Sequence, residues 1–458
     1  MCPPSTSARL EGVLRSVKRR FRLPHAPQSP AAWQHAPPST AVAATAVAAI
    51  IENARLAVEA GTPPGDDLRR GFCTALARLI DEAMSDAPGD AAYRALVLRH
   101  IAAPVREYAS LQARARRDRR AIRIAADAVA HPARLARIAH TPLRAALAAL
   151  HAAPTWTQLA DMARATRAMP ENSMHPHISE GLGRLLDDPA LARLCRMESL
   201  QADPQVQRYR QLWEQNGPAQ GSAAAAAQGA ASRQRGDEVE ALAARALQAL
   251  ADLLNRNEDA YRVVTSMRVP AAMPASARRA KSEWDAVLLR RAPHVEAAWD
   301  ICVLVEAKAS ADAAATDLPR LLRGLRLMAE ARPDTAYTFA TRQGPMTLRG
   351  SSLAALPTCA ETLAGTVLYC CNAPADAGAR LLSAASRMQL LSAPASLDYA
   401  GRLARGETAD ANALEPVWRL LLDAPAWRGV LHQYPLLRQA RELMVHPEDL
   451  LAAIAHAA

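Results

Sequence analysis

Apolar residues recur at helical spacing over most of this chain, and one central region breaks that rhythm. Between about residue 40 and residue 214, apolar side chains repeat every three to four positions, as at Leu76, Leu79, Ile80 and Ala83. This spacing is typical of helices that bury one face. Because proline cannot continue a helix, prolines at positions 104, 132, 142, 154 and 170 divide the region into several helices. We therefore predict an all-helical domain over residues 41–215.

The pattern changes in the middle of the chain. A strong helix is predicted over Asp237–Asn255, and three strand-like runs follow it, at Tyr261–Val269, Glu283–Leu289 and Ile301–Ala309. A further helix is predicted, and then two short strands, at Asp317–Ala331, Tyr337–Thr341 and Thr366–Cys371. Helical spacing resumes from about residue 375. The sequence thus predicts an α/β core over residues 237–372, a mixed sheet flanked by helices, with a C-terminal helical region over residues 373–458.

Two segments have the composition of connections rather than of domains. Residues 1–40 combine a basic stretch, from Arg15 to Arg22, with a proline-rich stretch that forbids a continuous helix. Residues 216–236 are rich in Gly, Ala, Ser and Gln, which favours an interdomain linker. The alanine run within this second segment could instead extend the helix that follows, so both interpretations stay open.

The amino-acid composition indicates which binding partners and which cellular compartment to expect. Lysine plus arginine exceeds aspartate plus glutamate by 55 − 45 = 10, which favours a polyanionic partner. The seven cysteines are scattered and form no Cys-x-x-Cys pair, so neither a disulfide framework nor a zinc ribbon is expected. The most apolar early run, Ala41–Ile51, is too short to cross a bilayer. We expect a soluble cytoplasmic protein that does not associate with membranes.

Charged residues interrupt two of the predicted strands. Glu306 and Lys308 lie two positions apart in an otherwise apolar strand, so strand alternation places both on one face. Asp285 interrupts the preceding strand, and the short connection between the two strands predicts a hairpin that brings it beside Glu306. Two neighbouring carboxylates repel each other, and Mg²⁺ is a hard ion that prefers such ligands. A lysine beside the ion could orient a water molecule or stabilise developing negative charge.

These residues resemble the signature of the PD-(D/E)XK nuclease superfamily. Asp285 is followed 21 positions later by Glu306-Ala307-Lys308, at the end of an apolar strand. The preceding helix carries a G-x-x-x-E-x-x-A-x-x-x-L pattern that is often seen on the first helix of the family, at Gly236, Glu240, Ala243 and Leu247. The resemblance covers about residues 236–372 and implies a restriction-endonuclease-like core. One departure is that Trp284, rather than proline, precedes Asp285.

The resemblance implies a metal-dependent nuclease that hydrolyses phosphodiester bonds, with DNA as the expected substrate. Asp285, Glu306, the carbonyl of Ala307 and Glu240 would hold Mg²⁺ or Mn²⁺, and Lys308 would position the attacking water. Many relatives act as dimers, so a homodimer is a further expectation. The alternative is a catalytically inactive core that binds nucleic acid or serves as a protein scaffold.

Several basic groups could contact a phosphate backbone. Arg320, Arg323 and Arg326 follow at three-residue steps on the helix after the motif, where relatives often carry basic residues. Arg278, Arg279 and Lys281 come just before the Asp285 strand. Farther away, the segment from Arg114 to Arg123 holds six arginines and one aspartate. Each group could equally be an ordinary solvated surface, and the sequence leaves these alternatives open.

Overall fold

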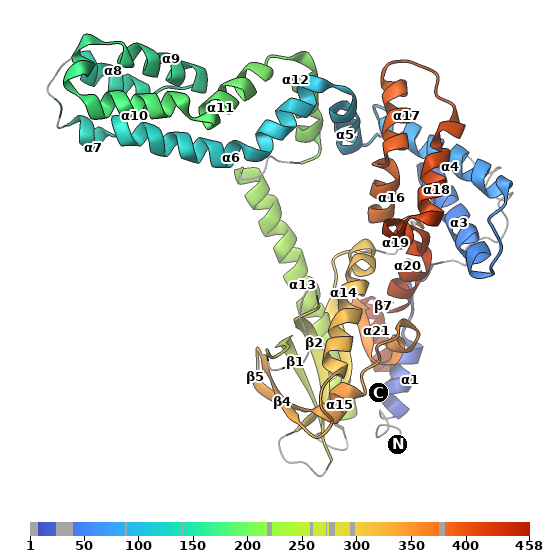
Figure 1. Cartoon of the computed structure of the whole chain (residues 1–458). Coiled ribbons are helices and arrows are strands. Elements are labelled where there is room, and N and C mark those ends of the chain that lie inside the picture. The colour runs from blue at the N-terminus through green and yellow to red at the C-terminus, as the bar shows by residue number, and fades with distance from the viewer. Residues whose placement is uncertain are drawn as a thin grey trace. The chain divides into compact units, whose positions relative to one another are not determined.

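The chain forms two compact units in a computed structural model (Figure 1). Unit 1 comprises residues 1–80, 220–396 and 410–458, and unit 2 comprises residues 81–219 and 397–409. The structure describes residues 8–23, 40–87, 89–136, 138, 142–217, 222–256, 260–271, 273, 280–293, 298–374 and 381–458.

Unit 1 is built around one mixed seven-stranded sheet. Its strands are β1 (Tyr261–Arg268), β2 (Glu283–Arg291), β3 (Trp299–Ala307), β4 (Ala336–Thr341), β5 (Gly344–Arg349), β6 (Val367–Cys370) and β7 (Met444–Val445). Their spatial order is β2-β1-β4-β5-β3-β6-β7, and β2 also pairs with β3. The five strands β2, β1, β4, β5 and β3 therefore close into a small barrel, while β6 and β7 extend the sheet beyond β3.

The first three strands form an antiparallel meander. β1 pairs with β2 from Tyr261↔Arg290 to Arg268↔Glu283, and β2 pairs with β3 from Ala286↔Val305 to Arg291↔Trp299. The predicted hairpin between β2 and β3 is thus confirmed. On its other edge, β3 pairs in parallel with β5 at one end and with β6 at the other.

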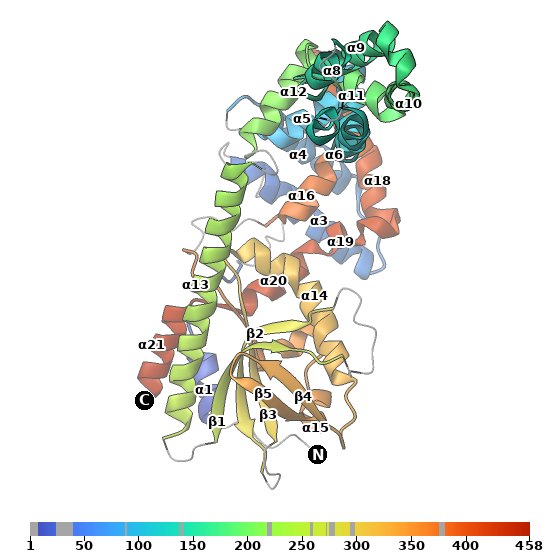
Figure 2. The same cartoon turned by 90° about the vertical axis from the view of Figure 1, so that its left-hand side faces the viewer.

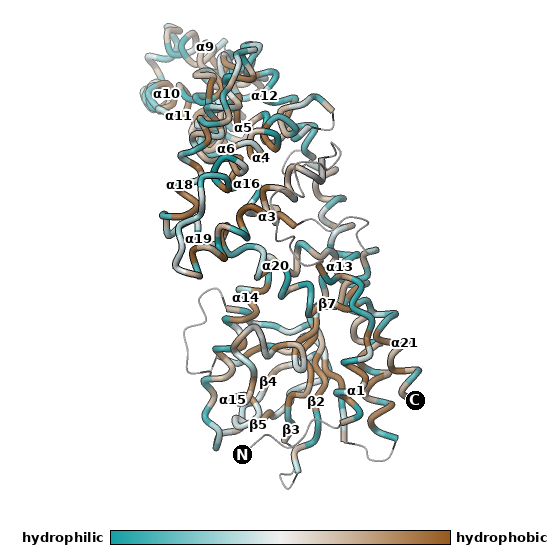
Figure 3. The backbone as a smooth tube through the Cα atoms, turned by 90° about the vertical axis from the view of Figure 1, so that its right-hand side faces the viewer, coloured by the Kyte–Doolittle hydropathy of each residue, from teal (hydrophilic) through white to brown (hydrophobic). Residues whose placement is uncertain are grey.

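Helices cover both faces of this sheet (Figure 2). On one face, α1 (Ala8–Ser16), α13 (Ala223–Leu254) and α21 (Pro447–Ala457) pack on the strands through a shared apolar cluster. On the other face, α14 (Ala311–Ala329) packs with the β4–β5 hairpin over a second cluster. β2 and β3 are mostly buried and carry many hydrophobic residues (Figure 3), as is expected for strands that are covered on both sides. In β4, buried residues alternate with exposed ones.

The remaining helices of unit 1 come from both halves of the chain. They are α3 (Thr40–Glu59), α4 (Asp66–Met84), α15 (Gly350–Ala354), α16 (Ala384–Leu391), α18 (Glu415–Asp423), α19 (Arg428–Leu431) and α20 (Gln433–Glu442). A further helix, α17 (Pro394–Ala404), begins in unit 1, but most of its residues belong to unit 2. α4 meets α18 through the rings of Phe72 and Trp418, whose centroids lie 5.2 Å apart. An ion pair of 3.0 Å joins Arg69 to Glu415. Segments that are far apart in sequence therefore share one helical layer.

Unit 2 is a helical bundle with an aliphatic and alanine-rich core. Its helices are α5 (Ala91–Ile101), α6 (Ala103–Ala130), α7 (Pro132–Leu135), α8 (Pro142–His151), α9 (Trp156–Arg167), α10 (Pro176–Asp187), α11 (Pro189–Leu200) and α12 (Pro204–Gln215). The prolines punctuate these helices as predicted: Pro132 and Pro142 each begin a helix, where the missing N–H group has no cost.

The segment boundaries in the structure differ from those expected. Residues 223–236, expected to be part of a linker, form the first turns of α13, capped by Ser222, whose hydroxyl accepts a bond from Ala225 N at 3.1 Å. Alanine sustains this helix although most of its first half is exposed. Residues 8–16 of the expected basic arm form α1, whose Leu10, Val13 and Leu14 are buried against the sheet layer.

The expected helical regions are also divided differently. Residues 41–80 belong to unit 1 rather than to a helical domain with residues 81–215, because α3 and α4 pack with C-terminal helices. The C-terminal region is not purely helical, since β7 adds a strand to the sheet. β5 was likewise not predicted from the sequence. No helix among the described residues is both long and apolar enough to span a bilayer.

Candidate active site on strands β2 and β3

The antiparallel register of β2 and β3 brings the two predicted carboxylates together. Ala286 pairs with Val305, so the next step of the register places Asp285 opposite Glu306. The backbone N–H of Ala307 donates a 2.8 Å hydrogen bond to Oδ2 of Asp285. Asp285 is half-buried and Glu306 is completely buried. The sequence prediction that these acids are neighbours is therefore confirmed.

Glu306 is a buried carboxylate held by two lysines. Its Oε2 lies 2.5 Å from Nζ of Lys281 and 3.2 Å from Nζ of Lys308. Its Oε1 is buried and has no hydrogen-bond partner among the described residues. Burial, followed by the nearby charge of Asp285, raises the pKa of Glu306 to about 7, although both lysines lower it. A buried acceptor without a partner is costly, so this oxygen is a candidate ligand atom.

Lys308 lies between two acids. Besides Glu306, its Nζ contacts Oδ2 of Asp317 on α14 at 3.3 Å. Asp317 also accepts a bond from the Tyr369 hydroxyl at 3.4 Å and pairs with Arg320 at 3.1 Å. Burial by itself lowers the pKa of Lys308, but the surrounding carboxylates outweigh it and the pKa is raised. Lys308 is therefore a cation that is held in place within the site.

Lys281 is part of this cluster rather than of a phosphate-binding surface. It was expected to contact nucleic acid, but its side chain is only 4% exposed and it pairs with Glu306. Its Nζ also lies 5.6 Å from the ring centroid of the buried Trp284. The backbone at Lys281 packs so closely on α14 that a Cβ at Gly324 would lie 2.8 Å from the Lys281 Cβ.

A signal for Lys281 was present in the composition. The chain contains only three lysines, Lys18, Lys281 and Lys308, which leaves 55 − 3 = 52 arginines. Two of the three lysines contact one carboxylate oxygen. Lysine is a compact point charge that fits a buried site where the broad guanidinium fork of arginine does not. Because all other basic residues of this chain are arginine, the rare lysines could have been singled out from the sequence as candidates for buried ionic contacts.

Glu240 lies on the opposite helical layer. It is a half-buried residue of α13, one position after the buried Val239. Burial, and then the charge of Asp285, raises the pKa of Glu240. No group of three or more His, Cys, Asp or Glu side chains within the described part of the chain is arranged to hold a metal ion. Glu240 thus interacts electrostatically with Asp285, but the two residues do not form a three-residue metal-binding group with Glu306.

A strained position lies opposite Asp285 on β1. Thr265 pairs with Ala286 and Met267 pairs with Trp284, so Ser266 occupies the register position that faces Asp285. Ser266 has a φ of 52°, in the left-handed region that costs a non-glycine residue about 1–2 kcal/mol. The β1–β2 ladder is interrupted at this point. Such strain is often found at functional sites.

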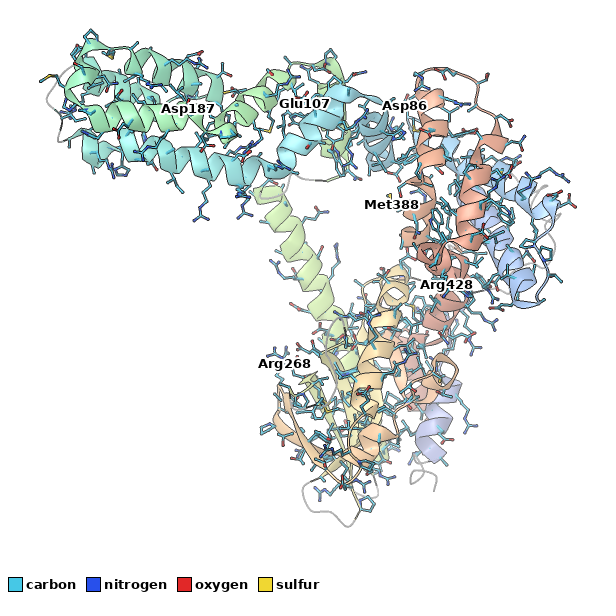
Figure 4. The ribbon with its side chains drawn as sticks, in the orientation of Figure 1. Asp86, Glu107, Asp187, Arg268, Met388 and Arg428 are labelled. Carbon is cyan, nitrogen blue, oxygen red and sulfur yellow. The ribbon has the colours of Figure 1, made fainter. Side chains whose placement is uncertain are left out.

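The other predicted nucleic-acid contacts have different outcomes. Arg320, Arg323 and Arg326 are all exposed on α14, the helix that also carries Asp317. Arg278 and Arg279 lie outside the described residues. The exposed end of β1 carries a further arginine, Arg268, which is paired with Glu283 at 3.4 Å (Figure 4). Exposed basic side chains therefore lie on α14 and β1, the elements beside the site.

Comparison of the chain with protein-family models, with curated proteins and with solved structures finds no match.

Proposed function

We propose that unit 1 is a metal-dependent nuclease that hydrolyses phosphodiester bonds, with DNA as its substrate. The observation that carries the proposal is the completely buried Glu306, whose Oε1 lacks a partner among the described residues and which lies opposite Asp285. Three antiparallel strands, a helix and a strand parallel to β3 follow α13, in the order expected for the nuclease family. The β4–β5 hairpin is an addition to that order.

The residues present fit a hard divalent cation. The available donors are all oxygens: the carboxylates of Asp285 and Glu306, and the carbonyl of Ala307. Mg²⁺ is commonly bound through one or two carboxylates, with water completing its shell, so a third acidic side chain is not required. When bound, Mg²⁺ or Mn²⁺ would lower the pKa of a coordinated water and neutralise charge on the phosphate. Glu240 on α13 interacts electrostatically with Asp285 and would support this site.

The chain's own residues would supply position and charge. Lys281 fixes Oε2 of Glu306, so that Oε1 is the free atom of that carboxylate. The N–H of Ala307 fixes Oδ2 of Asp285 in the same way. Lys308 would orient the attacking water and stabilise the charge that develops on the phosphate oxygens. Arg320, Arg323 and Arg326 would contact flanking phosphates from the exposed face of α14.

A second candidate function is a catalytically silent core that binds nucleic acid or a protein. One observation favours it: Lys281 already neutralises Glu306 at 2.5 Å, as in a purely structural buried ion pair. In that case the cluster would hold β3 against α14 and no metal would be needed.

A cleavage assay separates the two candidates. The full chain would be incubated with linear, nicked, single-stranded and branched DNA and with RNA, in Mg²⁺, Mn²⁺ or EDTA. We expect metal-dependent cleavage that Lys308→Ala lowers by at least about 100-fold, the usual scale for losing a group that stabilises transition-state charge. The matched control is Lys18→Ala, which removes the exposed third lysine and should leave cleavage unchanged. Absence of cleavage of every substrate by the wild type would overturn the nuclease proposal.

A further inference from the structure

Unit 2 carries a dense group of exposed arginines on α6. The six residues are Arg114, Arg116, Arg117, Arg119, Arg120 and Arg123, and all are exposed. They alternate along α6 with Ala115, Asp118 and Ile122, the buried residues of this segment. We call these six residues the α6 arginine surface. A net charge of +5 (six arginines minus Asp118) falls within ten residues of one helix.

The charge of this surface is compensated only in part, by Asp118, which interacts electrostatically with Arg114 and Arg117. None of its six guanidinium groups forms an ion pair or donates a hydrogen bond to another described residue of the chain. Other exposed arginines of unit 2 include paired ones: Arg196 binds Glu107 on α6 at 2.8 Å (Figure 4), and Arg164 binds Asp161. Two acids lie at four-residue spacing from this surface, Asp118 from Arg114 and Asp127 from Arg123. Asp118 is bound instead by Arg193, and Asp127 lies 3.3 Å from His151.

A pocket of about 620 Å³ opens beside the arginine surface and is lined by Arg114, Arg117, Asp118, Asp188, Ala190 and Arg193. Both of its acids are already engaged. Asp118 accepts two 2.8 Å bonds from Arg193, and Asp188 caps α11 by accepting a 2.8 Å bond from Ala190 N. Arg114 and Arg117 therefore present charge to the pocket without a bound carboxylate. This combination fits an anion, and the guanidinium fork matches a phosphate.

The shape of the surface favours a nucleic-acid duplex over other polyanions. The run from Arg114 to Arg123 extends roughly 13.5 Å along the helix, about four phosphate steps on one duplex strand. The only aromatic residue of α6, Tyr108, is buried, so no platform exists there for stacking single-stranded bases. Ile124 is the single large apolar side chain that α6 exposes. One such residue is too little for insertion of the helix into a lipid surface.

We propose that the α6 arginine surface binds the phosphate backbone of a nucleic-acid duplex, and that the pocket beside it holds one phosphate between Arg114, Arg117 and Arg193. Recognition is independent of base sequence, because only phosphates are contacted. The binding surface lies in unit 2 and does not depend on the metal or on Glu306. It therefore holds whether or not unit 1 is a nuclease.

Binding by the full chain in EDTA tests this proposal without cleavage. Fluorescence anisotropy would be measured with labelled duplex DNA of mixed sequence, duplex RNA and single-stranded DNA, over a salt series. The test variant is the triple substitution R114Q/R117Q/R120Q. The matched control is R99Q/R184Q/R210Q, which removes the same charge from exposed arginines on α5, α10 and α12.

We expect the test variant to weaken duplex binding by roughly 30-fold or more at 0.1 M salt, and to reduce the slope of log K against log salt by about two to three units. The control should change affinity by less than about 3-fold. Equal losses in the two variants would show that only net charge matters and would overturn the proposal. So would unchanged duplex binding in the test variant, or binding of phosphatidylserine vesicles in preference to either duplex. The DNA and RNA arms show which duplex is preferred, and Lys308→Ala cleavage reports separately on the nuclease.

Discussion

The cluster around Glu306 and the α6 arginine surface differ in whether their charged side chains are buried and paired. In unit 1, the completely buried carboxylate of Glu306 forms ion pairs with two lysines. In unit 2, six exposed arginines lie together, and none of them forms an ion pair with a carboxylate of the described residues. Burying an ion costs free energy unless partners compensate it, whereas an exposed ion is solvated at little cost. The first arrangement therefore has to be completed within the protein, and the second is left available to an external anion.

The difference indicates where stability and binding should be sensitive to mutation. Removing one partner of a buried pair leaves an uncompensated charge and destabilises the fold. Removing an exposed, unpaired arginine leaves nothing behind, so its effect should be seen only when the anion is present.

Lys281→Met should lower the free energy of unfolding by about 3 kcal/mol at pH 8, because Glu306 then loses its closer cation inside the protein. Urea denaturation followed by circular dichroism measures this change. Lys18→Met, at an exposed lysine, is the control and should change stability by less than about 0.5 kcal/mol. If K281M and K18M were equally stable, the buried pair would not contribute to the fold. Combining K281M with E306Q should recover part of the loss.

Stability should fall as the pH rises from about 4.5 to 7. Folded Glu306 keeps its proton up to a pKa of about 7, whereas the unfolded carboxyl loses it near 4.5. The folded state therefore binds more protons in this window, so deprotonation costs stability, by about 3 kcal/mol in total, and the change ends above pH 7. The difference between wild type and Glu306→Gln, measured by denaturation at several pH values, isolates this contribution. A difference that does not vary with pH would contradict the raised pKa.

Asp118→Asn should lower the free energy of unfolding by about 1–2 kcal/mol, since it weakens the two charge-assisted bonds from Arg193. Asp118 is the one member of the Arg114–Arg123 segment that is buried and paired, so it resembles Glu306 more than it resembles its neighbours. Thermal unfolding of the full chain measures the effect. Asp161→Asn, at an exposed ion pair of unit 2, is the control and should have a smaller effect.

R114Q/R117Q/R120Q should change the free energy of unfolding by less than about 0.5 kcal/mol in the absence of nucleic acid. The three side chains are exposed and unpaired within the described structure, so the folded state loses no protein contact. Thermal unfolding without and with duplex DNA measures both states. Duplex should stabilise the wild type more than the variant. A large loss without DNA would mean that the arginine surface is structural.

Local pattern predicted the chemically important part of unit 1. Strand alternation placed Glu306 and Lys308 on one face, and the short connection placed Asp285 beside them. These predictions succeeded because each rests on the geometry of one strand or one hairpin. β3 and α14 differ from the predicted segments only at their ends, and Ser310 begins α14 earlier than expected by capping it.

Contacts between distant segments could not be predicted in this way. β7 is two residues long, too short to show any alternation, and it is recognised only by its pairing with β6. The packing of α4 with α18 has no local signature either. Lys281 was misassigned for a related reason: a lysine just before a strand is normally solvated, and only the three-dimensional approach of Glu306 buries it. The closed barrel likewise depends on the β4–β5 hairpin meeting β1 and β3.

The position of β7 has a consequence for how the protein is made. The sheet that carries Asp285 and Glu306 gains its last strand from Met444 and Val445. The following helix, α21, then packs with α1 and α13 on one face of the sheet. A ribosome adds about 5–20 residues per second, and it must synthesise this segment well after β3 has emerged. During that interval the outer edge of β6 would be without its partner strand. The sheet is therefore completed late in synthesis, after all segments of unit 2 have been translated.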